Sequence, residues 1–349
     1  MNKLVYLLLE WYHQEKRILP WRQTKDPYHV WVSEIMLQQT RIEAVLGYYE
    51  RFMNRIPDIF ALAHIPEDEL LKLWEGLGYY NRARNLKKAA QIIVENYNGI
   101  FPSTYDEILK LPGIGEYTAS AIASICFNEP TVTVDGNVLR VYTRIQEDKR
   151  NISLNNTKKE IRNELSQMIP LESGDFNEGL MELGETICLP NGIPKCNLCP
   201  LQTFCLANKH HSWSKYPVKD EKKAKKELDY TIFLFTYEGM WAIRKRKDPG
   251  LLHNLWEFPN VPGKLSLNVV KAYLENNNIE GNITKSITNK HIFTHQVWNM
   301  TSYIIKLKEP LKEYLWKKPK EIEEQYALPT AFKPFFEEIK LKNVEINIK

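Results

Sequence analysis

The feature that most constrains the fold of this chain is a change in its apolar pattern after about residue 210. Before that point, apolar residues recur three or four positions apart, as in the series Ile42, Val45, Tyr49 and Phe52. This spacing predicts amphipathic helices. Beyond it, the run 230–237 is apolar at adjacent as well as alternate positions, which is typical of a strand buried on both faces. We therefore expect two domains of different structural class.

The boundary lies in residues 214–227, which are Lys-rich and nearly free of large apolar side chains. This composition indicates a linker, and a solvated tether or a contact with a DNA backbone would explain it equally well. We predict an all-α domain over 1–212, a linker over 213–227 and an α+β domain over 228–349. In the α+β domain we expect a turn at 238–239, helices at 267–276 and 332–339, and strands at 240–243 and 296–307.

The composition excludes few classes of function. Apolar residues make up 43% of the chain and charged residues 26%, as in an ordinary globular protein, and the net charge is +4. A nucleic-acid partner would require the basic residues to gather on one face. The apolar run 4–9 is too short for an export signal, and no stretch reaches the roughly 18 apolar residues of a membrane span. We expect a monomeric, cytoplasmic protein with no membrane partner.

Four of the five cysteines, Cys188, Cys196, Cys199 and Cys205, follow the pattern C-x7-C-x2-C-x5-C. Thiolates this close together can surround one metal centre, and both iron–sulfur clusters and closed zinc sites take four cysteines. In a reducing compartment a metal is expected before a disulfide. The spacing alone does not separate iron–sulfur from zinc. The remaining Cys126 lies in an apolar helical run and is expected in the core.

Residues 104–126 read as a helix, a hairpin and a second helix, with Leu111, Gly113 and Gly115 in the hairpin. Two glycines permit a backbone turn that any Cβ atom would obstruct. The amide groups at the start of the second helix would suit a phosphate oxygen. An ordinary turn between packed helices is the alternative interpretation.

Two carboxylates stand in mainly apolar surroundings. Glu34 follows Trp31 and Val32, a setting that could raise its pKa and make it a proton donor. Asp135 follows an apolar run and precedes a glycine, so it could simply cap a helix. Cleavage of a glycosidic bond needs one carboxyl group as acid and another that stabilises a cationic sugar. The N-glycosidic bond of a nucleotide makes the same electronic demand, so the pair is more informative than either residue.

Taken together, these motifs resemble the helix-hairpin-helix DNA glycosylases, and within them the adenine DNA glycosylases of the MutY type. The likeness extends over nearly the whole chain, and its most specific segments are 19–22, 33–41, 76–80, 134–138 and 181–184. The resemblance implies that Glu34 protonates adenine N7 and later activates water, and that Asp135 stabilises the sugar cation, supported by Asn137. Tyr117 stands where related endonuclease III enzymes carry a lysine nucleophile, which implies a monofunctional enzyme that leaves an abasic site.

The resemblance also implies the residues that would bind DNA. Gln39 and Tyr79 would fill the stack vacated by a flipped adenine. The adenine pocket would be lined by Trp21, Arg22, Leu37 and Glu182. For Trp21 and Leu37, simple core packing is the alternative. The four cysteines of 188–205 would hold one 4Fe–4S cluster, although the first gap has seven residues where the family usually has six.

The second domain resembles the Nudix-like domain of the same family, most clearly at 255–259. Residues 266–280 lack the Glu- and Arg-rich run of Nudix hydrolases, so we expect lesion recognition without nucleotide hydrolysis. Phe293, Thr294 and His295 match the loop that senses 8-oxoguanine, with Thr where the family commonly has Ser. The expected partner is double-stranded DNA that contains adenine opposite 8-oxoguanine or guanine.

Three other interpretations compete with this one. The chain could be a different enzyme of the superfamily, either an endonuclease III-like lyase or a thymine mismatch glycosylase. It could be a non-catalytic protein that binds DNA lesions, with the metal centre as a structural element. It could also be a Nudix-type hydrolase with a helical appendage, which the missing Glu and Arg run argues against.

Overall fold

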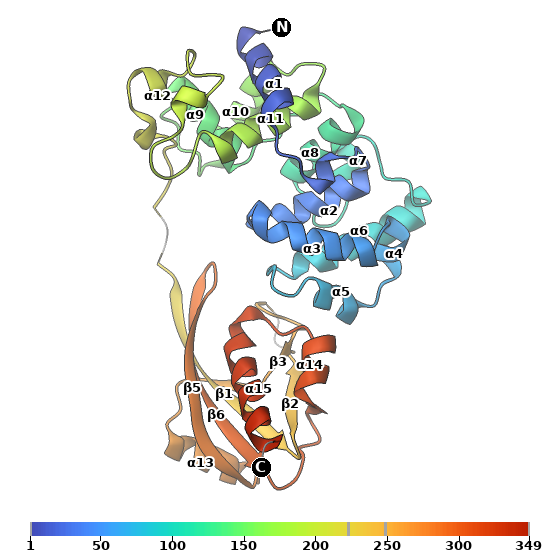
Figure 1. Cartoon of the computed structure of the whole chain (residues 1–349), viewed down its shortest axis with the longest axis vertical. Helices are drawn as coiled ribbons and strands as arrows, with labels where there is room; N and C mark the ends of the chain where they lie inside the picture. Colours follow the sequence, from blue (N-terminus) through green and yellow to red (C-terminus); the bar gives the residue numbers. More distant parts are fainter. Residues whose placement is uncertain (1, 222–223, 248–249, 348–349) are drawn as a thin grey trace. The chain divides into compact units, whose positions relative to one another are not determined.

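The computed structural model describes residues 2–221, 224–247 and 250–347. The chain divides into two compact units, the first comprising Met1–Ile65 and Arg84–Glu221 and the second Pro66–Ala83 and Lys222–Lys349. The first is helical and the second is built on a β-sheet (Figure 1). The finer domain boundaries given above stay a prediction.

Amphipathic helices make up the first unit, as the apolar spacing predicts. In α3, for example, the side chains of Val45, Tyr49 and Phe52 form the buried stripe. The helices are α1 (Lys3–Glu15), α2 (Pro27–Leu37), α3 (Ile42–Arg55), α4 (Ile59–His64), most of α6 (Asn81–Tyr97), α7 (Tyr105–Ile108), α8 (Glu116–Phe127), α9 (Gly136–Gln146), α10 (Asn155–Ser166), α11 (Ser173–Thr186) and α12 (Leu206–Lys209). Short 3₁₀ turns lie at η1 (Pro20–Arg22), η2 (Cys196–Leu198) and η3 (Trp213–Lys215).

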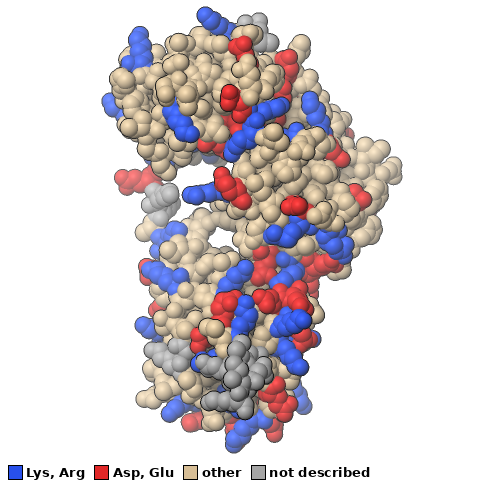
Figure 2. Space-filling model, in the orientation of Figure 1, with Lys and Arg blue, Asp and Glu red and all other residues tan. Residues whose placement is uncertain are grey.

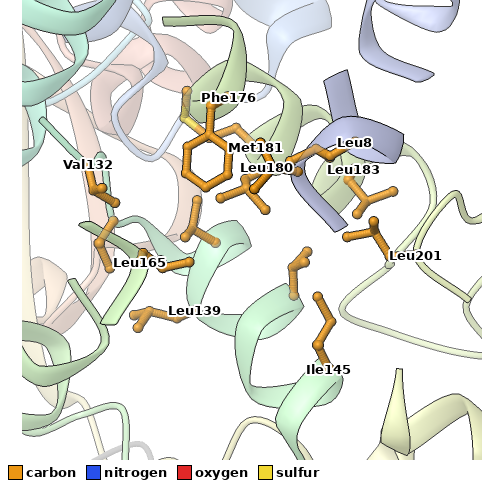
Figure 3. Close-up of a cluster of buried hydrophobic side chains, with 14 of the residues drawn as sticks. Leu8, Val132, Leu139, Ile145, Leu165, Phe176, Leu180, Met181, Leu183 and Leu201 are labelled. Atoms are coloured by element: carbon orange, nitrogen blue, oxygen red, sulfur yellow. The ribbon is translucent and has the colours of Figure 1, made fainter. Parts of the chain in front are cut away.

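The main core of the first unit lies where α11 packs against α1, α8 and α9 (Figures 1 and 3). Phe176 and Leu180 of α11 meet Leu8 of α1 and Leu139 of α9. Small residues let these helices approach closely: a Cβ atom on Gly184 would lie 2.6 Å from the Cβ atom of Asn137. The packing of α11 therefore sets the position of the first turn of α9.

The helix, hairpin and helix expected at 104–126 are present as α7, a short turn and α8. Gly113 has a φ of +77°, and a Cβ atom there would lie 2.5 Å from the Cβ atom of Asn85. Glycine is thus required at this position. The expectation that Gly115 has the same need is wrong, because its φ is −100° and a Cβ atom would meet nothing within 4 Å. Gly115 instead serves as the N-cap of α8.

The Lys-rich stretch between the two patterns begins as an ordered segment. Tyr216 is buried, and the Val218 carbonyl accepts a hydrogen bond of 2.9 Å from the Ile152 amide. Asn151 donates to the Asp220 carboxylate at 2.7 Å. The segment as far as Asp220 is therefore fastened to the loop that precedes α10 and belongs to the first unit.

The second unit contains a mixed sheet in the order β3-β2-β1-β6-β5, with β4 paired to β1 and β7 to β2. Strand β1 runs parallel to β6, which is antiparallel to β5. The strands are β1 (Lys226–Tyr237), β2 (Met240–Lys245), β3 (Trp256–Glu257), β4 (Asn260–Pro262), β5 (Gly281–Ile292), β6 (Gln296–Leu307) and β7 (Leu315–Lys317). The helices are α5 (Glu67–Leu73), α13 (Leu267–Asn276), α14 (Pro319–Gln325) and α15 (Lys333–Asn347), with a 3₁₀ turn at η4 (Thr330–Phe332).

Both faces of this sheet are covered, as the apolar run in β1 predicts. Ile232 and Leu234 belong to the core shared with α14 and α15, whereas Phe233 and Phe235 pack with α13. Side chains alternate across a strand, so a run buried on both faces must be apolar throughout. The expected helix at 267–276, the strand at 296–307 and the turn at 238–239 are confirmed.

Charged side chains of both signs are mixed over the face drawn in Figure 2, including the part formed by the sheet unit. The picture shows no large area of one sign on that face. Among the described residues, no helix combines the length and the apolar composition needed to cross a bilayer.

The contact between α11 and α9 leads to a stability prediction. In Gly184→Ala the added methyl group would collide with Asn137 and force the two helices apart, so we expect a loss of about 1–3 kcal/mol in the free energy of unfolding. Gly136→Ala is the control, because a Cβ atom there meets nothing within 4 Å. Urea unfolding monitored by circular dichroism measures both, and equal stability of Gly184→Ala and the unmodified chain would contradict the packing described.

Candidate functional site

A cavity of about 940 Å³, lined by both apolar and charged side chains, opens in the first unit. Its walls come from α1, η1, α2, α8, α9 and α11. Several of the predicted site residues line it together, namely Trp21, Arg22, Glu34, Leu37, Gln39, Gly115, Tyr117, Asp135 and Asn137. Residues that lie far apart in the sequence therefore converge on one space of the size of a small-molecule site.

Glu34 is held in the cavity wall by α2, which begins at Pro27 behind the N-cap Asp26. Its side chain is buried, and burial raises the pKa of the carboxyl group to about 7. A hydrogen bond from the Tyr117 phenol opposes the rise, while the negative charges of Glu178 and Asp135 add to it. Among the described residues, Oε2 of Glu34 has no hydrogen-bond partner. Glu34 can thus carry and release a proton near neutral pH.

Tyr117 lies in the first turn of α8, next to both carboxylates. Its hydroxyl group contacts the Met181 sulfur at 3.3 Å. Burial, followed by the charges of Glu34 and Asp135, raises the pKa of the phenol far above its usual range. Tyr117 therefore stays protonated and can donate a hydrogen bond but cannot act as an amine nucleophile.

Asp135 both caps a helix and faces the cavity. As the N-cap of α9, its Oδ1 atom accepts the Val138 amide at 2.7 Å, and its Oδ2 atom accepts the Asn137 side-chain amide at 2.8 Å. Burial raises the pKa of Asp135, and these hydrogen bonds to the carboxylate counteract only part of the rise. The two interpretations of this residue are compatible, because a capping carboxylate in a cavity wall is a fixed anion.

Asn137 connects this carboxylate to the cysteine loop. Its Oδ1 atom accepts a hydrogen bond of 2.8 Å from Arg140, and the same guanidinium group donates to the Gly184 carbonyl at 2.8 Å. Arg140 also donates to the Cys188 carbonyl at 2.7 Å. A single buried arginine thus joins α9, the end of α11 and the first cysteine.

The adenine-pocket residues differ from the expectation at one position. Trp21 and Leu37 line the cavity, with Trp21 packed edge-on against Tyr49, and Arg22 pairs with Glu178 at 3.0 Å. Among the described residues of the cavity wall, Glu182 is absent. Its carboxylate is fully enclosed and takes hydrogen bonds from both Arg17 and Arg22.

The acidic residue that α11 presents to the cavity is instead Glu178, one helical turn earlier. Burial raises the pKa of Glu178, although Arg22 and Tyr12 counteract the rise. Glu185 lines the cavity as well. The spacing of 178, 182 and 185 marks one helical face, and this spacing is the sequence signal for Glu178 and Glu185, which the family resemblance alone did not indicate.

The predicted DNA-contact residues occupy both units. Gln39 lies in the cavity wall of the first unit with a φ of +58°. Leu111 is buried beneath the hairpin. In the second unit, Tyr79 has a φ of +48°, is 46% exposed and hydrogen-bonds through its hydroxyl group to the Thr294 side chain. Left-handed backbone is uncommon for residues other than glycine, so these two sharp turns are local strain of the kind found at functional sites.

The residues 293–295 form the turn between β5 and β6. Phe293 packs edge-on against Trp298 with ring centroids 4.9 Å apart, and its amide donates to the Gln296 carbonyl at 2.8 Å. Thr294 and His295 are exposed at the tip. The turn is closed further by the Lys226 amide, which donates to the His295 carbonyl at 3.2 Å.

The four clustered cysteines surround one corner of the first unit. Cys188, Cys199 and Cys205 pack against the main core, and Cys188, Cys196 and Cys205 each raise the pKa of the Cys199 thiol, after the effect of burial. Arg144 donates to the Cys188 sulfur at 3.3 Å. All five cysteines of the chain are unbridged thiols. Across the described part of the chain, no group of three or more His, Cys, Asp or Glu residues is arranged to hold a metal ion.

Comparison with known proteins agrees with this geometry. A model described as "HhH-GPD superfamily base excision DNA repair protein" matches residues 32–171, and one for the NUDIX domain matches 231–338. The adenine DNA glycosylase of Buchnera aphidicola subsp. Baizongia pistaciae is 37% identical over 311 residues, which cover 87% of this chain and 86% of that protein. The chain belongs to the adenine DNA glycosylase family. The expected helical glycosylase domain and Nudix-like domain of this family are both confirmed.

Solved structures place this member of the adenine DNA glycosylase family among DNA N-glycosylases that bind double-stranded DNA. A thermostable thymine-DNA glycosylase is 31% identical with a TM-score of 0.54, and the match covers 59% of this chain and 95% of that one. A non-covalent endonuclease III–DNA complex is 25% identical with a TM-score of 0.51, covering 60% and 97%.

The burial of Glu34 predicts a pH-dependent stability. Because the pKa is about 7 in the folded chain and about 4.5 when exposed, the ionised form destabilises the fold increasingly between these two values. The neutral amide of Glu34→Gln escapes this cost. We expect the variant to match the unmodified chain at pH 4.5 or below and to exceed it at pH 8 by on the order of 3 kcal/mol. Urea unfolding at a series of pH values tests this, and parallel stability curves would contradict it.

Proposed function

We propose that this chain hydrolyses the N-glycosidic bond of adenine opposite 8-oxoguanine or guanine in double-stranded DNA and leaves an abasic site. The observation that carries the proposal is the pair formed by Glu34 and Asp135 in one cavity wall, with Tyr117 close to both. One carboxyl group holds a proton near neutral pH, and hydrogen bonds stabilise the other as an anion. Bond cleavage through a cationic sugar requires these two roles.

In the proposed reaction, Glu34 donates its proton to N7 of the extruded adenine. The bond from the sugar to the base then breaks, and its electron pair leaves with the protonated base as neutral adenine. The sugar is left as an oxocarbenium-like cation, which the Asp135 carboxylate stabilises more strongly than it stabilises the neutral nucleotide. The Glu34 carboxylate next accepts a proton from water as the water oxygen bonds to the anomeric carbon.

Tyr117 restricts the chemistry to hydrolysis. A lyase of this superfamily would use an amine to form a Schiff base with the sugar, and a phenol with a strongly raised pKa cannot do so. We therefore propose a monofunctional glycosylase. This favours the adenine interpretation over an endonuclease III-like lyase.

The same cavity would receive the flipped base. Trp21 and Leu37 offer apolar walls for a purine ring, and Glu178, with Arg22 beside it, offers a carboxylate to the adenine amino group. We assign that role to Glu178 in place of Glu182. Gln39 and Tyr79 would occupy the vacated stack, while Leu111, Gly113 and Gly115 would bring the α8 amide groups to a DNA phosphate.

We further propose that the 293–295 turn reads the base opposite adenine. Its exposed tip offers the Thr294 hydroxyl and the His295 ring as hydrogen-bonding groups. As an acceptor, the hydroxyl oxygen can bond the N7–H of 8-oxoguanine, a donor that guanine lacks at N7. It discriminates against the bare N7 of guanine when its own proton is engaged elsewhere, for example by the Tyr79 hydroxyl group. The extra methyl group of Thr relative to Ser leaves this capacity in place.

The four clustered cysteines would hold one 4Fe–4S cluster. The donor chemistry fits, because these residues are four unbridged thiols, the ligands that iron–sulfur clusters take, and Cys188 receives a hydrogen bond from Arg144. Such a cluster would cross-link the loop 188–205 and supply redox chemistry at that corner. We also propose that the protein acts as a monomer on DNA in the cytoplasm, where thiols remain reduced.

The excision assay tests the proposed reaction. A duplex with one adenine opposite 8-oxoguanine is incubated with the protein and then with hot alkali, which cuts at abasic sites. We expect cleavage at the adenine only after alkali, and a loss of at least about 100-fold in Glu34→Gln, since a general acid contributes at least this factor. Glu15→Gln, on the exposed surface of α1, is the matched control. Cutting without alkali would refute the proposal, as would an intact adenine in this duplex while parallel duplexes that carry an oxidised pyrimidine or a mispaired thymine are cut.

Metal analysis tests the cluster. Purified protein should be yellow-brown and contain about four irons per chain. Cys199→Ser should lower both iron content and visible absorbance, whereas Cys126→Ser should retain them, because Cys126 lies in α8 away from the cysteine loop. A colourless, zinc-containing and fully active protein would exclude the iron–sulfur assignment.

A further inference from the structure

Behind the 293–295 turn lies a column of aromatic and charged side chains that the proposed function does not use. Phe293 packs on Trp298, which is 1% exposed. The guanidinium carbon of Arg246 lies 5.3 Å from the centroid of the same indole ring. A cation over a desolvated indole ring is strongly attracted to it. Arg246 and Phe293 therefore both contact the ring of Trp298.

Glu257 fixes Arg246 in turn. The Nη1 atom of Arg246 lies 2.8 Å from Oε2 of Glu257, whose side chain is only 2% exposed. The second oxygen of Glu257 pairs with Arg244 at 3.0 Å. A buried carboxylate needs such partners, because an uncompensated charge in the interior is costly. Glu257 belongs to the 255–259 segment that resembles Nudix domains. In this chain the segment therefore also supplies the carboxylate that pairs with Arg244 and Arg246.

We infer that Arg246 is a positioning residue for reading the base opposite adenine. Through Trp298 it holds the ring of Phe293, and the Phe293 backbone closes the turn that carries Thr294 and His295. The turn can discriminate between bases only if its tip is held in one position. The inference rests on the proposed function, in which this turn recognises 8-oxoguanine opposite adenine.

Arg244 provides a comparison within the same cluster. It pairs with the same carboxylate as Arg246, but it is 36% exposed and its other contact is to the Asn260 carbonyl at 3.1 Å. A change at Arg244 therefore disturbs the pairing of Glu257 without removing the contact with Trp298. Lysine preserves the charge at either position but lacks the planar guanidinium group that stacks on an indole.

The experiment measures single-turnover excision rates of the full chain on two duplexes, with adenine opposite 8-oxoguanine or opposite guanine. In Arg246→Lys we expect the preference for 8-oxoguanine to fall about tenfold, with the rate opposite guanine retained within about twofold. Arg244→Lys should keep both rates within about twofold. Thermal unfolding by circular dichroism shows whether each variant folds.

Three results would overturn the inference: an unchanged preference in Arg246→Lys, an equal loss on both duplexes, or the same loss of preference in Arg244→Lys. Should Arg246→Lys fail to fold, the same rates are measured for Trp298→Phe. A retained preference for 8-oxoguanine in that variant refutes the proposed role of Arg246 and Trp298. If the unmodified chain excises adenine but shows no preference for 8-oxoguanine, the proposal that the 293–295 turn recognises 8-oxoguanine is refuted, and so is this inference. An unmodified chain that does not excise adenine instead refutes the proposed reaction.

Discussion

The burial of one carboxyl group, that of Glu34, is the constraint on which the rest of the site depends. Water cannot stabilise its charge, so its proton is held up to about neutral pH. Asp135 is buried as well, yet the Val138 amide and the Asn137 side chain hydrogen-bond its ionised form. Burial raises the pKa of both groups, but the hydrogen bonds to Asp135 counteract the rise there, so an acid and an anion can lie together in one cavity.

Helix packing around α11 makes this separation possible. Close approach at Gly184 brings α11 against the first turn of α9, where Asp135 and Asn137 lie. Arg140 then spans from Asn137 to the backbone of Cys188, so the cysteine loop and the cavity share one buried hydrogen-bond network. In a low-dielectric interior such networks hold polar groups in fixed positions, which an electrostatic mechanism needs.

The second unit depends on the same physical effects, namely the burial of apolar side chains and the pairing of enclosed charges. Its sheet is apolar on both faces, so α13 covers one face and α14 with α15 the other. The carboxylate of Glu257, enclosed in that interior, is paired with Arg244 and Arg246. This rigid base supports the 293–295 turn, and a rigid scaffold with an exposed loop tip is a common arrangement for recognition.

The sequence by itself determined the local structure and the chemistry that was available. Apolar spacing predicted the helices and the buried strands, and a carboxyl group beside Trp31 and Val32 predicted the raised pKa of Glu34. Only the tertiary structure decided which acidic residue of α11 meets the cavity. Glu178 and Glu182 lie one turn apart on the same face, and Glu182 is enclosed behind its partners Arg17 and Arg22, which line the cavity with Glu178. The same holds for the contact of Arg140 with Cys188, because forty-eight residues separate the partners and only the packing of α9 against α11 brings them together.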